Sequence, residues 1–242
     1  MLFQNATVGI IELVVSLSVV FTGSKAVCLD EVNDARGAAG FANFTTASEE
    51  VLKWPQTSES TALQSGDPWL PVCEALVPKD EASTETRGGS TAAFVSGTYA
   101  FMALNSDQPE CSAAVDHWKE AFSNFTSIPP SKTDGGNLYD KRQNISFVAM
   151  YNPIDGAAAD CRVVTCTLKA SAAGRTLRSD AEGKKGYALL CMTVPDAFKD
   201  GKTSPFTEDE WSKIKKALTG SASAVGPSLL AIAAVALGLV AL

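Results

Sequence analysis

The sequence predicts one disulfide-stapled α/β domain of the α+β type, in which helices flank a mostly antiparallel sheet to give three layers. Two segments carry an apolar stripe at helical spacing, and four short apolar segments are bounded by turn residues, as strands are. The six cysteines are an even number and predict three disulfides. Residues 27–220 are enough to bury one core, so a second domain is not needed.

Residues 1–26 are predicted to be a secretory signal peptide. Residues 8–22 are mostly apolar, and Ser24 and Ala26 are small residues at the third and first positions before a cut after Ala26. The match is imperfect, because no Lys or Arg precedes the apolar run and Glu12 interrupts it. A cleaved leader would deliver an ectodomain of residues 27–220 to an oxidising compartment, where disulfides form.

Three segments between residues 28 and 90 are assigned by composition. Residues 28–40 suit a helix that Gly40 ends. A short helix is expected around residues 48–54, stopped by Pro55. Residues 80–90 are polar and predict an exposed loop.

Two later helices can be argued residue by residue. The first has apolar residues at steps of three and four, namely Cys111, Ala114, Val115, Trp118, Phe122 and Phe125. The second begins where Thr207 and Glu210 form a capping box and Phe206 can pack on Trp211 as a hydrophobic staple. Both helices therefore have one face to bury against a sheet.

Four strands are predicted, at residues 97–104, 145–152, 161–168 and 187–194. Cys161 and Cys166 are five residues apart in one of them, so they point to opposite faces and do not easily pair with each other. Six cysteines allow fifteen pairings, and the spacing alone does not choose among them. The cysteines are Cys28, Cys73, Cys111, Cys161, Cys166 and Cys191.

The C-terminal tail has the layout of a glycosylphosphatidylinositol (GPI) attachment signal. Small residues begin at Gly220 and Ser221, a short spacer follows, and residues 229–242 are all apolar. As a helix, this apolar run rises about 21 Å, which is short of a hydrocarbon core of about 30 Å. Attachment is expected at Gly220 or Ser221, with residues 221–242 removed as a propeptide. The alternative, a buried C-terminal helix, would need a polar face that this run lacks.

The charge limits the partners. A formal net charge of −7 and a pI near 4.8 argue against nucleic acid and against broad attraction to anionic lipid, so membrane contact is expected through the anchor only. Acceptor patterns for N-glycosylation occur at Asn43, Asn124 and Asn144, although each fits an unmodified polar residue equally well.

A basic loop separates the last two predicted strands. It spans residues 169–185 and is long for a hairpin connection, so it is either a solvated tip or a partner-binding loop for sulfated host glycans. Its cations are Lys169, Arg175, Arg178, Lys184 and Lys185.

The sequence does not predict an enzyme. The single histidine, His117, lies one step off its helix's apolar stripe, and no serine stands in a nucleophile-elbow pattern. One histidine and no CxxC pair do not make a zinc site, so neither metal nor cofactor is expected.

The chain resembles the surface antigens of the coccidian parasite Eimeria, the SAG family. The resemblance covers nearly all of residues 27–220 and is carried by CLDEVNDAR, AVDHWKEAFSNF, ISFVAMYNP, DCRVVTC, YALLCMTVPDAF and PFTEDEWSKI, with LTGSAS at the anchor. It implies a GPI-anchored antigen on the outer leaflet of an apicomplexan plasma membrane. Its expected roles are attachment to the host-cell surface and immune display.

These antigens look like distant relatives of the cysteine-rich secretory, antigen-5 and pathogenesis-related (CAP) superfamily. The CAP-like resemblance implies an α/β/α sandwich and the pairs Cys28–Cys111, Cys73–Cys166 and Cys161–Cys191. It also implies the alternative function of a lipid- or sterol-binding carrier. The superfamily's metal-cleft positions fall at Val32, at Thr98, near Ala121 and Glu120, and at residues 142–144, where this chain lacks the usual His and Glu set. The resemblance thus implies that the metal cleft is lost.

Overall fold

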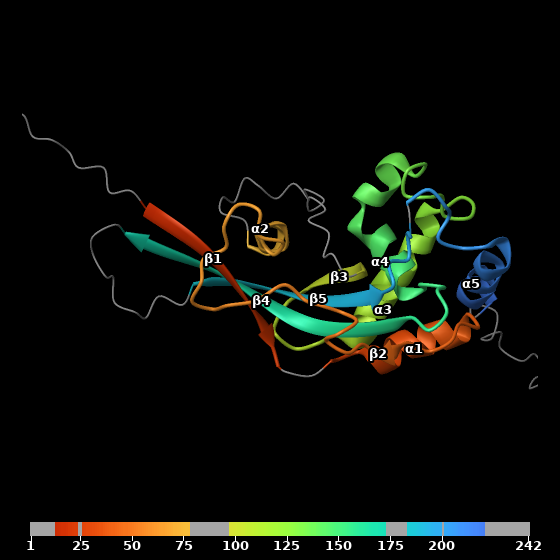
Figure 1. Cartoon of the computed structure of the whole chain (residues 1–242), viewed down its shortest axis with the longest axis horizontal. Coiled ribbons are helices and arrows are strands. Elements are labelled where there is room, and N and C mark those ends of the chain that lie inside the picture. Colours follow the sequence, from red (N-terminus) through yellow and green to blue (C-terminus); the bar gives the residue numbers. More distant parts are fainter. Residues whose placement is uncertain (1–12, 24–25, 78–96, 173–182, 200, 221–242) are drawn as a thin grey trace, which may run out of the picture.

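The computed structural model describes residues 13–23, 26–77, 97–172, 183–199 and 201–220 (Figure 1). A sheet with the strand order β1-β4-β5-β3 lies at its centre, and every neighbouring pair in that order is antiparallel. A short β2 pairs parallel with β4, on the same edge as β1. The fold is therefore α+β with a mostly antiparallel sheet, as predicted. The strands are β1 (Leu13–Thr22), β2 (Thr45–Thr46), β3 (Thr98–Leu104), β4 (Ala158–Ala172) and β5 (Lys184–Val194).

Helices lie on both faces of the sheet and bury two separate cores. One core joins α1, α3, α4 and α5 to the sheet, and the other lies under α2 and the segment that precedes it. Figure 1 shows α2 apart from the other helices, near β1. Among the described residues, none of the helices is long and apolar enough to cross a membrane. The helices are α1 (Leu29–Ala38), α2 (Leu70–Leu76), α3 (Cys111–Glu120), α4 (Arg142–Met150) and α5 (Glu208–Gly220), with 3-10 turns η2 (Ala121–Asn124) and η3 (Gly136–Asp140).

The two helices argued from periodicity are confirmed. In α3, Trp118 is fully buried, and its indole nitrogen donates to the Phe101 carbonyl of β3 at 2.9 Å. At the start of α5, the Thr207 amide donates to the Glu210 carboxylate at 2.7 Å, and the Glu210 amide donates back to Oγ1 of Thr207 at 3.3 Å. Together these bonds form the predicted capping box.

Two predicted elements are wrong. Residues 145–152 were expected to be a strand, but most of them belong to α4, where every residue from Asn144 to Met150 is buried. A short run buried on all sides has no polar face, so its periodicity cannot distinguish a helix from a strand. The helix expected at residues 48–54 is a turn, in which the Leu52 amide bonds the Ser48 carbonyl.

The six cysteines form three disulfides, Cys28–Cys111, Cys73–Cys166 and Cys161–Cys191. These are the pairs that the CAP resemblance implied. The first ties α1 to α3, the second ties α2 to β4, and the third crosses from β4 to β5. The first bond thus links two helices of one layer, the second joins the α2 layer to the sheet, and the third links two neighbouring strands.

A buried arginine closes one end of the larger core. Arg36 is 2% exposed, and its guanidinium donates to the carbonyls of Ala42, Met150 and Asn152 at 2.9, 3.0 and 2.9 Å. The guanidinium also lies over the Phe44 ring at 3.6 Å from the centroid. Burial lowers the pKa of Arg36 to about 10, with a smaller opposing effect from Tyr151. The end of α1 is thereby bound to the end of α4.

Three buried tyrosines lie in the two cores. Tyr139 donates its hydroxyl to the Pro130 carbonyl at 2.6 Å, and Tyr151 packs edge-on against Phe147. Tyr99 lies beneath the guanidinium of Arg142 at 4.5 Å. Burial raises the pKa of all three phenols, and Arg36 and Arg142 partly offset this for Tyr151 and Tyr99.

Candidate functional site

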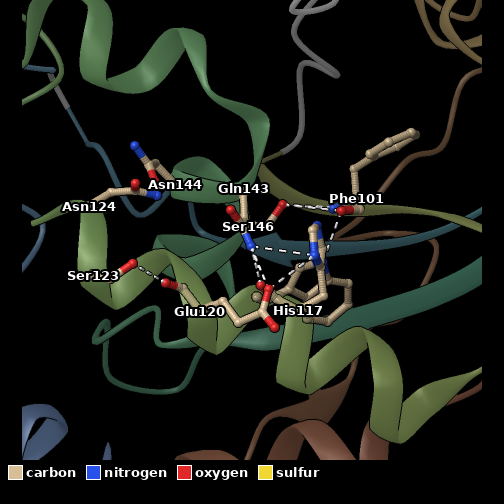
Figure 2. Close-up of polar contacts among 9 residues, drawn as sticks. Phe101, His117, Glu120, Ser123, Asn124, Gln143, Asn144 and Ser146 are labelled. Atoms are coloured by element: carbon tan, nitrogen blue, oxygen red, sulfur yellow. Dashed lines mark hydrogen bonds and ion pairs between the residues drawn. The ribbon is translucent and has the colours of Figure 1, made fainter. Parts of the chain in front are cut away.

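A polar cluster joins α3 to α4 on the outer side of the larger core (Figure 2). The Gln143 amide nitrogen of α4 donates to the His117 carbonyl at 2.5 Å and lies 3.5 Å from the Glu120 carboxylate. The His117 ring is 3.8 Å from that carboxylate and 3.4 Å from the Gln143 nitrogen. The side chains of His117 and Glu120 are 43% and 73% exposed, so solvent reaches both.

Beside this cluster, two amides and a hydroxyl bind helix α4 in place. Asn124 donates to Oδ1 of Asn144 at 2.8 Å, and Asn144 donates to the Leu138 carbonyl at 2.6 Å. Ser146 donates to the Arg142 carbonyl at 2.9 Å and accepts from the Phe101 amide at 2.9 Å. These side chains use their hydrogen-bonding groups to join elements, which is a structural role.

The positions of the superfamily's metal cleft are occupied by other contacts. Val32 and Ala121 are buried in the larger core, and the Thr98 hydroxyl donates to the Asp196 carboxylate. Among the polar side chains at these positions, the Gln143 amide lies 3.5 Å from the Glu120 carboxylate, and an amide is a poor ligand for a transition metal. Within the described ranges, no three His, Cys, Asp or Glu side chains are placed to hold a metal ion.

A hollow of about 270 Å³ lies between α1 and α3. Five of its eight lining residues are charged or polar, and the other three are apolar: the carboxylates Glu31, Asp34 and Asp116 with Ser112 and Lys119 on one hand, and Ala35, Ala38 and Val115 on the other. Lys119 is 3.6 Å from Asp116, so one of the three charges is already paired at the rim. A hollow with a charged, solvated rim does not suit an apolar ligand such as a sterol.

The three glycosylation acceptors differ in accessibility. Asn43 is exposed between α1 and β2, whereas Asn124 is half-buried and bonded to Asn144. Asn144 is fully buried inside the fold. The folded domain has room for a glycan at Asn43 and none at Asn144.

The basic loop is described in part. Lys169 at the end of β4 and Lys184 and Lys185 at the start of β5 are exposed, and Leu168 pairs with Lys184 in the β4–β5 ladder. Three lysines therefore gather at one end of the sheet. Arg175 and Arg178 lie outside the described residues, as does Ser221, while Gly220 is the exposed last residue of α5.

One cluster was missed by sequence reasoning. The Trp54 indole donates to the Asp160 carboxylate at 2.9 Å, and Arg162 donates to the same carboxylate at 2.9 Å. Trp54 also stacks on Trp69, with ring centroids 6.0 Å apart. No spacing in the sequence relates residue 54 to residues 160 and 162, because the sheet topology brings them together.

Comparisons with known proteins agree with the resemblance to the SAG family. Residues 24–233 match the model of the sporozoite surface antigen (SAG) protein domain. The chain is 29% identical over 231 residues to the sporulated oocyst TA4 antigen of Eimeria tenella, covering 89% of this chain and 87% of that protein. No solved structure matches the chain. The chain belongs to the sporozoite surface antigen family of Eimeria.

Proposed function

We propose that the protein is a GPI-anchored surface antigen, displayed on the outer leaflet of the parasite plasma membrane. In this proposal residues 1–26 are cleaved as a leader and residues 221–242 are exchanged for the lipid. The proposal further takes the helices on both faces of the sheet as the α/β/α sandwich of the CAP superfamily. The three disulfide pairs support it, since they match those of the resemblance.

The position of Gly220 carries the anchoring proposal. Helix α5 is closed by its capping box at one end, and it ends at Gly220, which is exposed. A transamidase needs an accessible small residue between a folded domain and an apolar tail. Gly220 and Ser221 stand at that boundary in the sequence.

We propose attachment to host cells and immune display as the roles of the ectodomain, with no catalytic step. Three lysines at one end of the sheet, Lys169, Lys184 and Lys185, are cations that a sulfated glycan can contact. The carrier alternative has no observation in its favour among the described residues, because the hollow between α1 and α3 has a charged rim.

Adhesion of cells displaying the full chain to host epithelial cells tests the attachment role. The variant K169A/K184A/K185A is compared with K141A/K215A/K216A, which removes three exposed lysines elsewhere. The proposal expects cells that display the protein to adhere more than untransfected cells do. Adhesion should fall several-fold in the first variant but not in the second, and excess heparin should lower the adhesion of cells with the unchanged protein. Equal adhesion with and without the protein would contradict the attachment role. Equal loss in both variants would exclude the lysine cluster as the contact.

A further inference from the structure

The leader strand β1 occupies a strand-shaped slot. Its partner on one side is β4, with Val19 opposite Cys166, and on the other side the Leu63 amide donates to the Leu17 carbonyl at 2.7 Å. Val19 also makes an isolated bridge to Ser58. We use the name leader slot for the space between residues 163–168 of β4 and residues 58–63.

The leader side chains that face α2 are apolar and well buried. Leu17 and Val19 are 3% and 1% exposed and belong to the smaller core. Phe21 meets both Trp54 and Trp69 edge-on, each at 5.6 Å between centroids. Three alternate residues, Leu17, Val19 and Phe21, therefore fill the slot, and the aromatic ring lies at one end of it.

The β4 wall and the apolar floor of the slot are held by contacts that do not involve the leader. Trp54 is bonded to Asp160, and the Trp69 indole donates to the Pro55 carbonyl at 3.3 Å. The Cys73–Cys166 disulfide ties α2 to the middle of the β4 wall. The other edge of β4 pairs with β5 along Ala158–Leu168. Removal of residues 1–26 leaves all of these contacts in place.

We infer that the leader slot of the cleaved ectodomain is a binding site for an extended peptide segment of another protein, added to the sheet antiparallel to β4. This inference rests on the proposed function, in that the leader is cleaved after Ala26. Cleavage leaves the β4 edge with unpaired amides and carbonyls beside an uncovered apolar floor, which is the surface that strand addition uses.

The seated leader defines the chemistry of the ligand. The segment carries aliphatic residues at two alternate positions and an aromatic ring two residues further on, as Leu17, Val19 and Phe21 do. The intervening positions hold Ser18 and Val20, and Thr22 bonds the Thr165 hydroxyl at 2.8 Å. Backbone pairing supplies affinity, and the alternate apolar positions supply specificity.

The test uses mature protein purified from cells that express the full chain, and its N-terminus is first read by mass spectrometry. The probe is a synthetic peptide of residues 13–22 with two lysines added at each end for solubility. Fluorescence anisotropy of the labelled peptide measures affinity. Hydrogen exchange measures protection of the amides within residues 163–168 that point toward the slot, because the alternate amides are already bonded to β5. The control peptide carries Leu17→Asp and Val19→Asp.

The inference expects binding that slows exchange in residues 163–168, whereas the aspartate peptide neither binds nor protects. Phe21→Ala in the peptide should weaken binding about tenfold, since it removes two aromatic contacts. Trp54→Ala in the protein should weaken it to a similar extent, and Trp54→Phe should restore part of the affinity. If Trp54→Ala does not fold, the peptide series alone decides.

Three results would overturn the inference. One is equal binding of the wild-type and aspartate peptides, or no binding of either. Another is slow exchange, without peptide, of those amides of residues 163–168 that point away from β5. In a monomer this would mean closure by residues 58–63, and in a dimer it would mean pairing with a second copy. The third is an N-terminus that retains the leader, since the slot is then filled. Only this last result also contradicts the proposed processing, and the mass measurement identifies it separately from binding.

Discussion

Replacement of Arg36 by methionine tests the physical account of the core most sharply. The change keeps a long unbranched side chain but removes the guanidinium that binds three carbonyls and covers Phe44. The Met150 and Asn152 carbonyls are buried, and each costs about 1–3 kcal/mol when left unpaired, whereas Ala42 is exposed and water can replace its bond. A desolvated cation–ring contact contributes about 2 kcal/mol. Against this, methionine removes the cost of burying a charge, which is several kcal/mol.

We expect a net loss of about 3 kcal/mol in the free energy of unfolding for Arg36→Met. Arg36→Lys should lose about 2 kcal/mol, because one ammonium does not reach three carbonyls in a planar fork. The control is Arg142→Met, a half-buried arginine over Tyr99, for which we expect about 1 kcal/mol.

Urea unfolding followed by tryptophan fluorescence measures all three variants. The four tryptophans are divided between the two cores, so the fluorescence change reports the unfolding of both cores. An Arg36→Met loss no larger than that of Arg142→Met would refute the reasoning, because the three carbonyls would then not depend on the guanidinium.

Three further predictions concern glycans, disulfides and alkaline pH. Asn43→Gln should lower the intact mass by one glycan. Asn144→Gln should leave the glycan mass unchanged and should instead lower the melting temperature. A glycan at Asn144 would contradict the fold around α4. Replacing Cys73 and Cys166 together by serine opens a bond with a sequence separation of 93 and should cost about 4.6 kcal/mol in urea unfolding, and a loss below 1 kcal/mol would show that α2 is not held by this bond. The three buried tyrosines have raised pKa values, so the unfolded chain loses their protons first and stability is lost as pH rises above about 10. Arg36 has the opposite effect, because its lowered pKa means that the unfolded chain binds more protons above about pH 10, but three phenols outweigh one guanidinium. Absorbance at 295 nm should therefore show phenol ionisation together with unfolding, and ionisation of all tyrosines in a folded domain would contradict their burial.

The sequence predicted secondary structure correctly where apolar residues recur at a regular spacing and polar residues separate them. The stripe of α3 and the capping box of α5 depend on neighbours three or four residues apart, and the structure confirms both. Helix α4 has no polar face, so its apolar run was wrongly predicted as a strand. The role of β1 was not predicted either, because an apolar N-terminal run is typical of a targeting segment.

The contacts that matter most for the proposals are long-range and leave no local signal. In the sequence, Arg36 cannot be distinguished from an ordinary basic residue in the last turn of a helix, and only the fold reveals its carbonyl partners. The same holds for Trp54 and Asp160, which lie 106 residues apart in sequence. Similarly, the disulfide pairing followed from the family resemblance and could not be obtained from the spacing of six cysteines.

The most direct test of the central proposal is the mass of the protein that phosphatidylinositol-specific phospholipase C releases from cells expressing the full chain. The proposal predicts release of a chain that begins at Val27, ends at Gly220 or Ser221 with the remnant of the glycolipid, and contains three disulfides. Retention on the cell of a chain that still ends at Leu242 would contradict the anchored-antigen proposal.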